Sequence, residues 1–207
     1  TYDKLGNVVS ETDFNGNTTT YRYNKLGQLI ETLTPFTGTN TSYHRNYYDK
    51  NGNLSREEQQ NNAVSSNVQT HTVIRYLYDS RDRLIATVTN DGTSDYIARV
   101  EYDDVGNVLK NITGLTSLME EINPQQHSIT TFQYNKQNNP ISVTDALGAS
   151  ATATYDNLGN AITTTDKNGA TITNTYDGLG RVLSQSAGGK SVSYVYNKLG
   201  QVSKMTD

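Results

Sequence analysis

Apolar and β-branched residues in this chain gather in short segments of about six residues, and polar segments rich in Asp, Asn and Gly separate them. Ala161–Thr165 and Ala170–Tyr176 are two of these segments, and both are rich in Thr, Ile and Val. Segments of this length and composition predict β-strands joined by turns.

The polar segments repeat one motif nine times. The motif has Tyr, then Asp or Asn, two variable residues, a residue that tolerates a left-handed backbone and, shortly after it, an aliphatic residue. Successive copies lie 20 to 32 residues apart, so the basic period is about 21 residues with insertions. A period of this size indicates a repeat architecture, in which each unit packs against its neighbours. The motif tyrosines are Tyr2, Tyr23, Tyr48, Tyr78, Tyr102, Tyr134, Tyr155, Tyr176 and Tyr196.

Each motif has the composition of a tight hairpin turn. In Asp156-Asn157-Leu158-Gly159, Asp and Gly occupy the first and fourth positions that a type I turn favours. A three-residue hairpin loop of this kind needs its last residue in the left-handed region. Asp and Asn, which stand in for Gly in two copies, tolerate that region best after Gly. The predicted left-handed positions are Gly6, Gly27, Gly52, Asp82, Gly106, Asn138, Gly159, Gly180 and Gly200.

The same geometry predicts which residue lies opposite each motif tyrosine. If Asp156 pairs with Asn160 around the loop, the partner of the tyrosine lies two residues after the left-handed position. An aromatic residue facing an aliphatic one across an antiparallel pair contributes roughly 0.2–1 kcal/mol. The predicted partners are Val8, Leu29, Leu54, Leu84, Val108, Ala161, Val182 and Val202, with Pro140 as the exception.

A second type of turn follows about half a repeat later, as in Asp13–Gly16, Asp145–Gly148 and Asp166–Gly169. Each repeat is therefore predicted to be one hairpin, and residues 1–207 one repeat domain of about nine repeats. The predicted fold is all-β, a continuous antiparallel meander of about 18 strands. Because twisted open sheets rarely exceed about 10 strands without curling, we expect a spiral or an open half-tube.

Three polar stretches, residues 34–47, 57–72 and 113–128, interrupt the period, and we expect them to lengthen hairpins or form loops. Within the third stretch, Leu115, Leu118, Met119 and Ile122 have the spacing of a short amphipathic helix. Pro124 would end that helix, and an irregular loop is the alternative. Pro140 cannot donate to a strand ladder and marks an irregular or edge position.

The composition of the chain indicates how the sheet is buried and argues against two classes of function. Hydrophobic residues make up 33% of the chain, which favours a sheet buried weakly on one face over a two-layer core. The net charge is −4 and no basic cluster occurs, which argues against nucleic-acid binding. No apolar run approaches the roughly 18 residues of a membrane span. The chain starts inside one repeat and stops just after another, so we expect a fragment of a longer polypeptide.

No catalytic, cofactor-binding or metal-binding residue is predicted. The segments starting at Asp13 and Asp49 resemble the beginning of a calcium loop, but the distant Glu is missing and the hairpins need turns there anyway. His44, His71 and His127 lie in separate insertions without ligands at metal-binding spacing. No nucleophile elbow, phosphate loop or zinc-protease motif occurs, so an enzyme is the weakest hypothesis.

Two roles are possible for the tyrosines. In the first interpretation they are structural and pair with aliphatic residues across strands. In the second interpretation they form a platform for sugar rings, because Tyr21/Tyr23, Tyr76/Tyr78 and Tyr194/Tyr196 each place two rings on one face about 7 Å apart. The sequence does not decide which face of the sheet is buried.

At these residues the chain resembles the bacterial RHS/YD-repeat family. Tyr176–Val182 follows the family motif Tyr-Asp-x-x-Gly-Arg-Leu, and the resemblance covers essentially the whole chain. Several copies have Asn or Gln where the family often has Arg, as at Asn7, Gln28, Asn107 and Gln201. The resemblance implies a long β-sheet that forms a hollow shell around a toxic or unfolded C-terminal polypeptide. The aspartate-based self-cleaving motif of family toxins does not occur here.

Two hypotheses follow from the residues and the resemblance together. The first is a non-catalytic wall segment of a secreted or surface-exposed bacterial toxin shell, whose partners are its flanking repeats and the C-terminal effector. The second is a cell-surface module that binds polysaccharide or a partner through exposed tyrosines. Unpaired edge strands would also allow self-association of the fragment.

Overall fold

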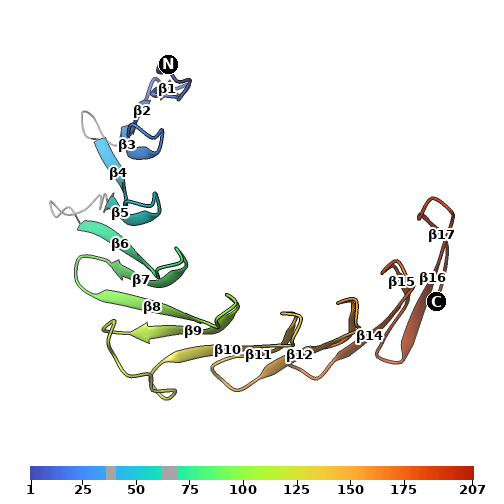
Figure 1. Ribbon diagram of the computed structural model, residues 1–207. Helices are drawn as coiled ribbons and strands as arrows, with labels where there is room; N and C mark the ends of the chain where they lie inside the picture. Colours follow the sequence, from blue (N-terminus) through green and yellow to red (C-terminus); the bar gives the residue numbers. More distant parts are fainter. Residues whose placement is uncertain (36–40, 62–69) are drawn as a thin grey trace. The chain divides into compact units, whose positions relative to one another are not determined.

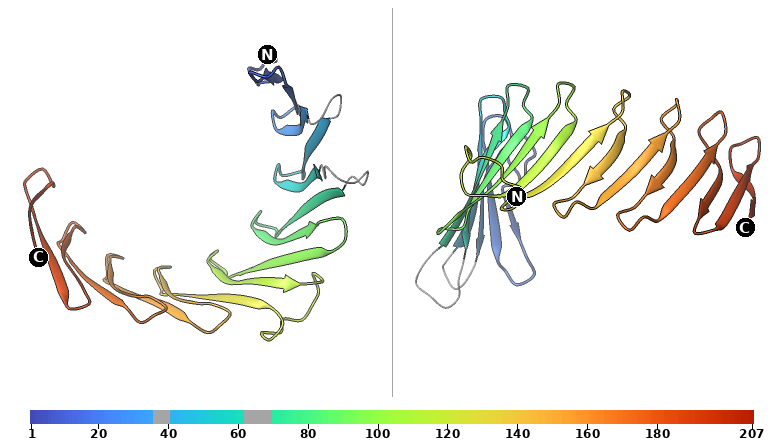
Figure 2. Two further views of the ribbon diagram at one scale, coloured as in Figure 1. Left: turned by 180° about the vertical axis from the view of Figure 1, so that it is seen from behind. Right: turned by 90° about the horizontal axis from the view of Figure 1, so that it is seen from below.

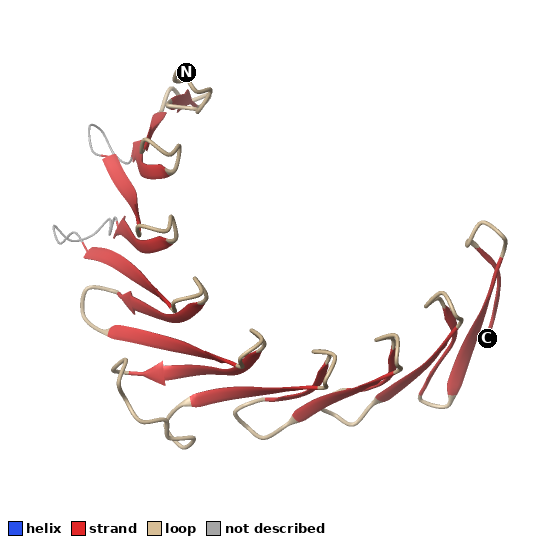
Figure 3. Ribbon diagram, viewed as in Figure 1, coloured by secondary structure: helices blue, strands red, loops and turns tan. Residues whose placement is uncertain are grey.

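The computed structural model of the chain describes residues 1–35, 41–61 and 70–207. Residues 36–40 and 62–69, which belong to two of the predicted insertions, lie outside the described residues. The described part of the chain forms 17 β-strands and no helix (Figures 1 and 3). The strands are β1 Ser10–Thr12, β2 Thr18–Tyr23, β3 Leu29–Pro35, β4 Thr41–Tyr48, β5 Leu54–Asn61, β6 Thr70–Tyr78, β7 Leu84–Asn90, β8 Asp95–Tyr102, β9 Val108–Leu115, β10 Ser128–Tyr134, β11 Pro140–Thr144, β12 Ser150–Tyr155, β13 Ala161–Thr165, β14 Thr171–Tyr176, β15 Val182–Ala187, β16 Lys190–Tyr196 and β17 Val202–Thr206.

Every described register joins two strands that follow each other in the sequence, and all of these pairs are antiparallel. The predicted fold class, an all-β meander of antiparallel hairpins, is therefore confirmed. The number of strands is one below the expected value because the first repeat begins with a single isolated bridge, Tyr2 to Val8. Curling into a spiral or half-tube stays a prediction.

The chain divides into two compact units. The first contains Thr1–Arg99 and Thr113–Glu121, and the second contains Val100–Ile112 and Ile122–Asp207. Both units consist of the same element, a hairpin that lies beside the next hairpin (Figure 2). The grouping of all 207 residues into one repeat domain stays a prediction.

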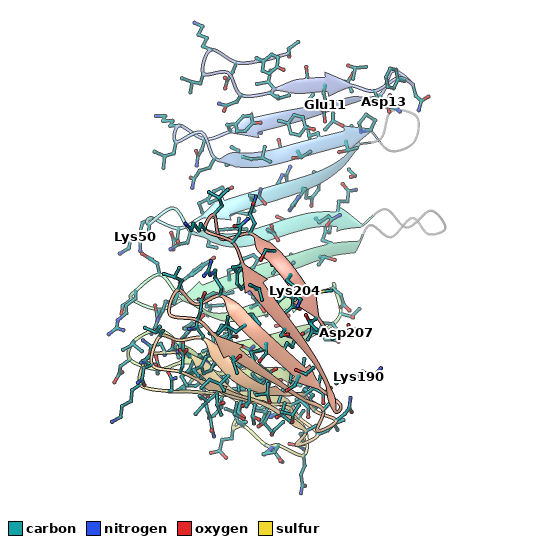
Figure 4. The ribbon with its side chains drawn as sticks, turned by 90° about the vertical axis from the view of Figure 1, so that its right-hand side faces the viewer. Glu11, Asp13, Lys50, Lys190, Lys204 and Asp207 are labelled. Carbon is teal, nitrogen blue, oxygen red and sulfur yellow. The ribbon has the colours of Figure 1, made fainter. Side chains whose placement is uncertain are left out.

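Within each unit the hairpins have two different ends. The nine motif turns lie at one end, which we call the tyrosine-turn edge; the shorter or more variable connections lie at the other, which we call the variable edge. In the first unit, Lys50 marks the tyrosine-turn edge and Asp13 marks the variable edge (Figure 4). The tyrosine-turn edge therefore has similar contacts in every repeat, whereas the variable edge accommodates insertions.

Each unit also has two faces, because successive side chains of a strand point to opposite sides. The tyrosine face is the face that carries the motif tyrosines. The far face is the opposite one, and it includes Arg22, Glu31 and Arg45, which lie directly across from one another on β2, β3 and β4. The described structure has no second layer of secondary structure, so about half of the described residues are half-buried, nearly as many are exposed, and few are buried.

The most buried apolar side chains lie where the third insertion begins. In the first unit, Ala86, Val88, Ile97 and Leu115 are at most 5% exposed. Arg99 holds the same region together, because its guanidinium donates to the carbonyls of Leu118 and Glu120 at 3.4 and 3.2 Å. The insertion therefore packs against β7 and β8.

The predicted helix around Leu115–Ile122 is wrong. Leu115 is the last residue of β9, and Met119 is 91% exposed. The Glu120 carboxylate accepts hydrogen bonds from the amides of Thr116 and Ser117, at 2.6 and 3.2 Å. Amides that would begin a helix are thereby bound to a side chain three or four residues later, and the segment forms bends and turns instead.

Candidate functional site

The tyrosine-turn edge is built by one set of hydrogen bonds repeated nine times. In each turn the amide of the left-handed residue donates to the carbonyl of the turn Asp or Asn, at 3.0–3.2 Å. The side-chain oxygen of that Asp or Asn also accepts amides, as Asp156 does from Leu158 and Asn160 at 2.9 and 2.8 Å. The predicted turn chemistry is therefore present at each copy.

A second bond in each turn explains the residue that follows the left-handed position. Where the turn begins with Asp, a donor follows: Asn160 donates to Asp156 at 2.8 Å, and the Arg181 Nε donates to Asp177 at 2.7 Å. In two of the three turns that begin with Asn, Gln follows and accepts, as Gln28 does from Asn24 at 2.7 Å; in the third turn, which begins at Asn135, Asn139 follows. The replacement of Arg by Asn or Gln thus preserves the bond.

These bonds shift the acidity of the turn carboxylates. The side-chain and backbone hydrogen bonds from Asn160 hold the pKa of Asp156 below its ordinary value of 3.8. The backbone and side-chain hydrogen bonds from Arg181 do the same for the pKa of Asp177. The carboxylates therefore remain charged and serve as structural acceptors.

All nine predicted left-handed positions have positive φ, between 59° and 108°. The two that are not Gly use their side chains to contact the preceding repeat. Asp82 accepts from Asn53 at 2.8 Å, and Asn138 accepts from Asn107 at 2.9 Å. A Cβ added to Gly180 would lie 3.2 Å from the corresponding Asn160 side chain. Neighbouring turns thus touch along the edge.

The motif tyrosines lie opposite the predicted partners. Eight pairs are present in the described registers: Tyr2–Val8, Tyr23–Leu29, Tyr48–Leu54, Tyr78–Leu84, Tyr134–Pro140, Tyr155–Ala161, Tyr176–Val182 and Tyr196–Val202. All motif tyrosines except Tyr2 are half-buried, and Tyr2 is 72% exposed.

A contact that the sequence did not reveal links six of the repeats to the repeat before them. The tyrosine hydroxyl donates to the backbone carbonyl of the residue that faces the preceding tyrosine, for example from Tyr176 to Ala161 at 2.8 Å. We call this bond the tyrosine tether. It occurs from Tyr23 to Val8, Tyr48 to Leu29, Tyr78 to Leu54, Tyr155 to Pro140, Tyr176 to Ala161 and Tyr196 to Val182, at 2.8–2.9 Å. Each ring therefore bridges two repeats.

On the far face of the first unit, charged residues lie across neighbouring strands. Glu31, 8% exposed, accepts from Arg22 at 2.9 Å and from Arg45 at 2.7 Å. The hydrogen bond from Arg45 lowers the pKa of Glu31 more strongly than the bond from Arg22 does. Further along, Arg56 pairs with Glu58 at 3.2 Å, and Arg75 pairs with Asp95 at 3.5 Å.

On the far face of the second unit, the same positions carry hydroxyl groups. From β10 to β17, most pairs on this face place Ser or Thr opposite Ser or Thr, with Gln133–Ser142 and Val195–Lys204 as exceptions. Several pairs bond directly, such as Thr154 with Thr163 at 2.6 Å. We call these residues the hydroxyl rows. They are Thr131, Ser142, Thr144, Ser150, Thr152, Thr154, Thr163, Thr165, Thr171, Thr173, Thr175, Ser184, Ser186, Ser191, Ser193 and Thr206.

The other sequence candidates do not converge on a reactive site. Asp13 and Asp49 accept amides of their own turns. His71 contacts the Tyr43 hydroxyl at 2.7 Å, and His44 lies 3.9 Å from Glu57. Among residues 1–35, 41–61 and 70–207, no three His, Asp or Glu side chains gather as a metal site would require. No helix in the described part of the chain could span a membrane.

Several tyrosines of the predicted glycan platform form hydrogen bonds within the protein that the sequence did not indicate. Tyr76 donates to Glu57 at 2.7 Å, and burial together with that bond raises the pKa of Tyr76 to about 12. Tyr21 donates to Glu11. Tyr78 and Tyr196 are tethered to carbonyls. Their hydroxyls are therefore bound within the sheet, and a role of these rings in glycan binding stays a prediction.

An array of tethered β-hairpins, with a Tyr-Asp turn in every unit, defines a class of repeat protein. The RHS Repeat family model matches residues 2–44, 134–171 and 176–207, which is more than half of the chain. The chain therefore belongs to the RHS repeat family. No curated protein sequence matches it.

Solved structures share the fold. The crystal structure of TcdB2-TccC3-Cdc42 aligns with a TM-score of 0.56 and 11% identity, over 96% of this chain and 12% of the other. TcdB2-TccC3 without its hypervariable C-terminal region gives 0.53 and 11%, over 97% and 12%. A Tc holotoxin pore from Photorhabdus luminescens gives 0.51 and 13%, over 97% and 12%. The chain spans about an eighth of the length of these proteins.

Proposed function

We propose that this chain is a non-catalytic wall segment of a longer, secreted or surface-exposed bacterial RHS-repeat protein, and that the wall encloses or presents a C-terminal effector polypeptide. The family and the fold support a structural role in an RHS-repeat shell. The observation that carries the proposal is the tyrosine tether, because it joins a hairpin to the preceding one at six repeats and needs no other partner.

The tether suits a wall because it makes the sheet extendable and stiff. Six repeats donate a tyrosine hydroxyl to the equivalent carbonyl of the repeat before them, so flanking repeats of the same chain would dock in the same way. A repeat array of this kind gains stability from nearest-neighbour interfaces and not from a central core. An extended barrier can then be built with few fully buried side chains.

Limited proteolysis of the full-length parent tests the proposal. The polypeptide downstream of residue 207 is followed by mass spectrometry, first in the intact parent and then after the repeats have been cut or omitted. Enclosure predicts that the downstream segment survives in the intact parent and is digested without the repeats. Equal digestion in both preparations would overturn enclosure.

A cell-surface module that binds polysaccharide is the second candidate, and the hydroxyl rows of the second unit favour it. Those rows present many neutral donors and acceptors over neighbouring strands. Binding of this chain to a polysaccharide array, lost when Thr163 and Thr173 are replaced by Val while thermal stability is kept, would support that candidate.

A further inference from the structure

The tyrosine face of the second unit contains a hollow at a position where other repeats carry an aromatic ring. The position two residues before each motif tyrosine lies on the same face as that tyrosine. In four repeats it carries an aromatic ring, at Tyr21, Tyr76, Phe132 and Tyr194. In the repeat of Tyr155 the same position is Ala153.

The missing ring leaves open space. A hollow of about 400 Å³ lies over β11 to β14, and its walls include Ile141, Val143, Ala153, Tyr155 and Ile172. A closed apolar cavity of about 150 Å³ is enough for a benzene ring in a protein. The hollow is larger but open to solvent, so it has room for one ring that stays partly exposed. The hollow is also bordered by a fixed wall, because Tyr155 is tethered to the Pro140 carbonyl at 2.8 Å.

The lining specifies the chemistry of the occupant. Apart from Tyr155, Thr164 and the rim residue Asp166, the lining side chains on the tyrosine face are aliphatic. Ser142, Thr152 and Thr165 also line the hollow but belong to the hydroxyl rows of the far face. The carboxylate of Asp166, on the rim, already accepts the amides of Asn168 and Ala170 at 2.8 and 2.9 Å. A sugar ring would need several polar side chains free to bind its hydroxyls, whereas an aromatic ring needs apolar walls and an aromatic edge or face.

We propose that this hollow binds the aromatic side chain of a polypeptide that lies along the tyrosine face. The ring would lie over Ala153, at the position that Phe132 and Tyr194 hold in their own repeats, opposite Thr164 and beside the Tyr155 ring. Naming the enclosed polypeptide as the source of that side chain rests on the proposed function. The affinity of the hollow for an aromatic ring does not.

The first test uses this chain and a small probe. N-acetyl-phenylalanine amide is titrated while the methyl signals of Ile141, Val143 and Ile172 are followed by NMR. We expect saturable shifts at these methyls, with a dissociation constant on the order of 1 mM. N-acetyl-leucine amide should bind at least about fivefold more weakly, because it lacks the ring that contacts Tyr155.

Ala153→Phe supplies the ring that the other repeats have and should weaken probe binding at least about tenfold, since the hollow is then filled. Ala153→Val should have an intermediate effect, which keeps the test valid if the larger residue perturbs folding. Ser193→Phe is the matched control: it adds the same ring on the far face and should leave binding unchanged. Equal affinities in all variants, or shifts spread over both faces, would overturn the proposal.

The second test uses the full-length parent and identifies the source of the ring. Ile172→p-benzoylphenylalanine places a photo-crosslinker at the rim, and mass spectrometry locates the cross-linked segment. The proposal expects a cross-link to an aromatic-containing segment downstream of residue 207, lost when Ala153→Phe is added. If the downstream segment is protected from protease but does not cross-link, this inference fails while enclosure stands.

Discussion

The two units share the same hairpins, turns and tyrosine tethers, which we call the frame, but their far faces carry different side chains. In the first unit that face has Arg and Glu in direct contact, with Glu31 held between two guanidinium groups. In the second unit the equivalent positions carry Ser and Thr, bonded to one another across strands. Turns, tyrosine tethers and the pairs of tyrosine with an aliphatic residue occur in both units.

The difference shows which contacts define the hairpin and which are free to vary. The turn aspartates and tyrosines recur wherever the backbone must reverse and dock, so they belong to the frame. The far face is not needed for that purpose, because either ionic or hydroxyl pairs fill it. Sensitivity to charge should therefore differ between the units, while sensitivity to turn and tether substitutions should not.

Removing the central carboxylate of the ionic face should have the largest effect. We expect Glu31→Gln to cost about 2 kcal/mol, because Arg45 and Arg22 both lose a charged acceptor. Hydrogen exchange measured by mass spectrometry should show lost protection in β2–β4 and little change in β13–β15. Thr163→Val is the control in the second unit, with an expected change within about 0.5 kcal/mol. Loss of protection in both units would show that the ionic far face of the first unit does not stabilise that unit specifically.

The left-handed positions test the shared frame. Gly27→Ala and Gly180→Ala both place a Cβ at φ near 78°, which costs about 1 kcal/mol. Gly180→Ala should cost up to about 2 kcal/mol, because its Cβ also crowds Asn160. Gly180→Asn should recover much of the loss, since Asn138 adopts the same backbone at the equivalent position. Thermal denaturation of the three variants measures these differences, and equal midpoints would contradict the assigned crowding.

Removing a tether hydroxyl should have the same effect in both units. We expect Tyr48→Phe and Tyr176→Phe each to cost about 1 kcal/mol. The acceptor carbonyls remain partly satisfied, because Asn46 also donates to Leu29 and Asn174 also donates to Ala161, at 3.1 and 3.2 Å. Adding Asn174→Ala to Tyr176→Phe should therefore cost more than the two single changes together. Denaturant titrations provide the values, and strict additivity would argue against a shared acceptor.

Acid should weaken the turns through the carboxylates. Because folding lowers the pKa of Asp156, its stabilising effect is complete above the ordinary value of 3.8 and is lost as the pH falls below it. The pair Asp156→Asn with Asn160→Gln copies the neutral turn of Asn24 and Gln28. We expect this double variant to match the parent at pH 7 and to lose less stability at pH 3. An unchanged acid loss, measured by denaturant midpoints at both values, would show that the Asp156 turn does not titrate as assigned.

Much of the frame could be predicted because it depends on local chemistry. The left-handed position after Leu158, and the pairing of Tyr155 with Ala161, follow from a turn of three residues and its bulge. The bond from Asn160 or Arg181 back to the turn carboxylate was not foreseen, although the sequence held a signal. Gln follows only where Asn replaces Asp at the start of the turn, as at Gln28 and Gln201.

The remaining features depend on contacts between segments far apart in sequence. The tyrosine tether ends on a backbone carbonyl, such as that of Leu29, which no side chain identifies. Near Leu118 no helix forms, because Glu120 binds the amides of Thr116 and Ser117, and Arg99, on another strand, binds the carbonyls of Leu118 and Glu120. The hydroxyl rows, in contrast, have a local pattern in the sequence. Between Ser142 and Ser193, Ser or Thr often occurs at every second residue, which is the spacing of side chains on one face of a strand.

The direction of the tether bears on how such arrays change in length over evolution. In each tether the tyrosine hydroxyl donates to the repeat before it, and the carbonyl accepts from the repeat after it. Duplication of a gene segment that encodes one hairpin would therefore produce a longer array in which both new junctions already carry their partners. No other position would have to mutate at the same time, so array length and local sequence can evolve separately.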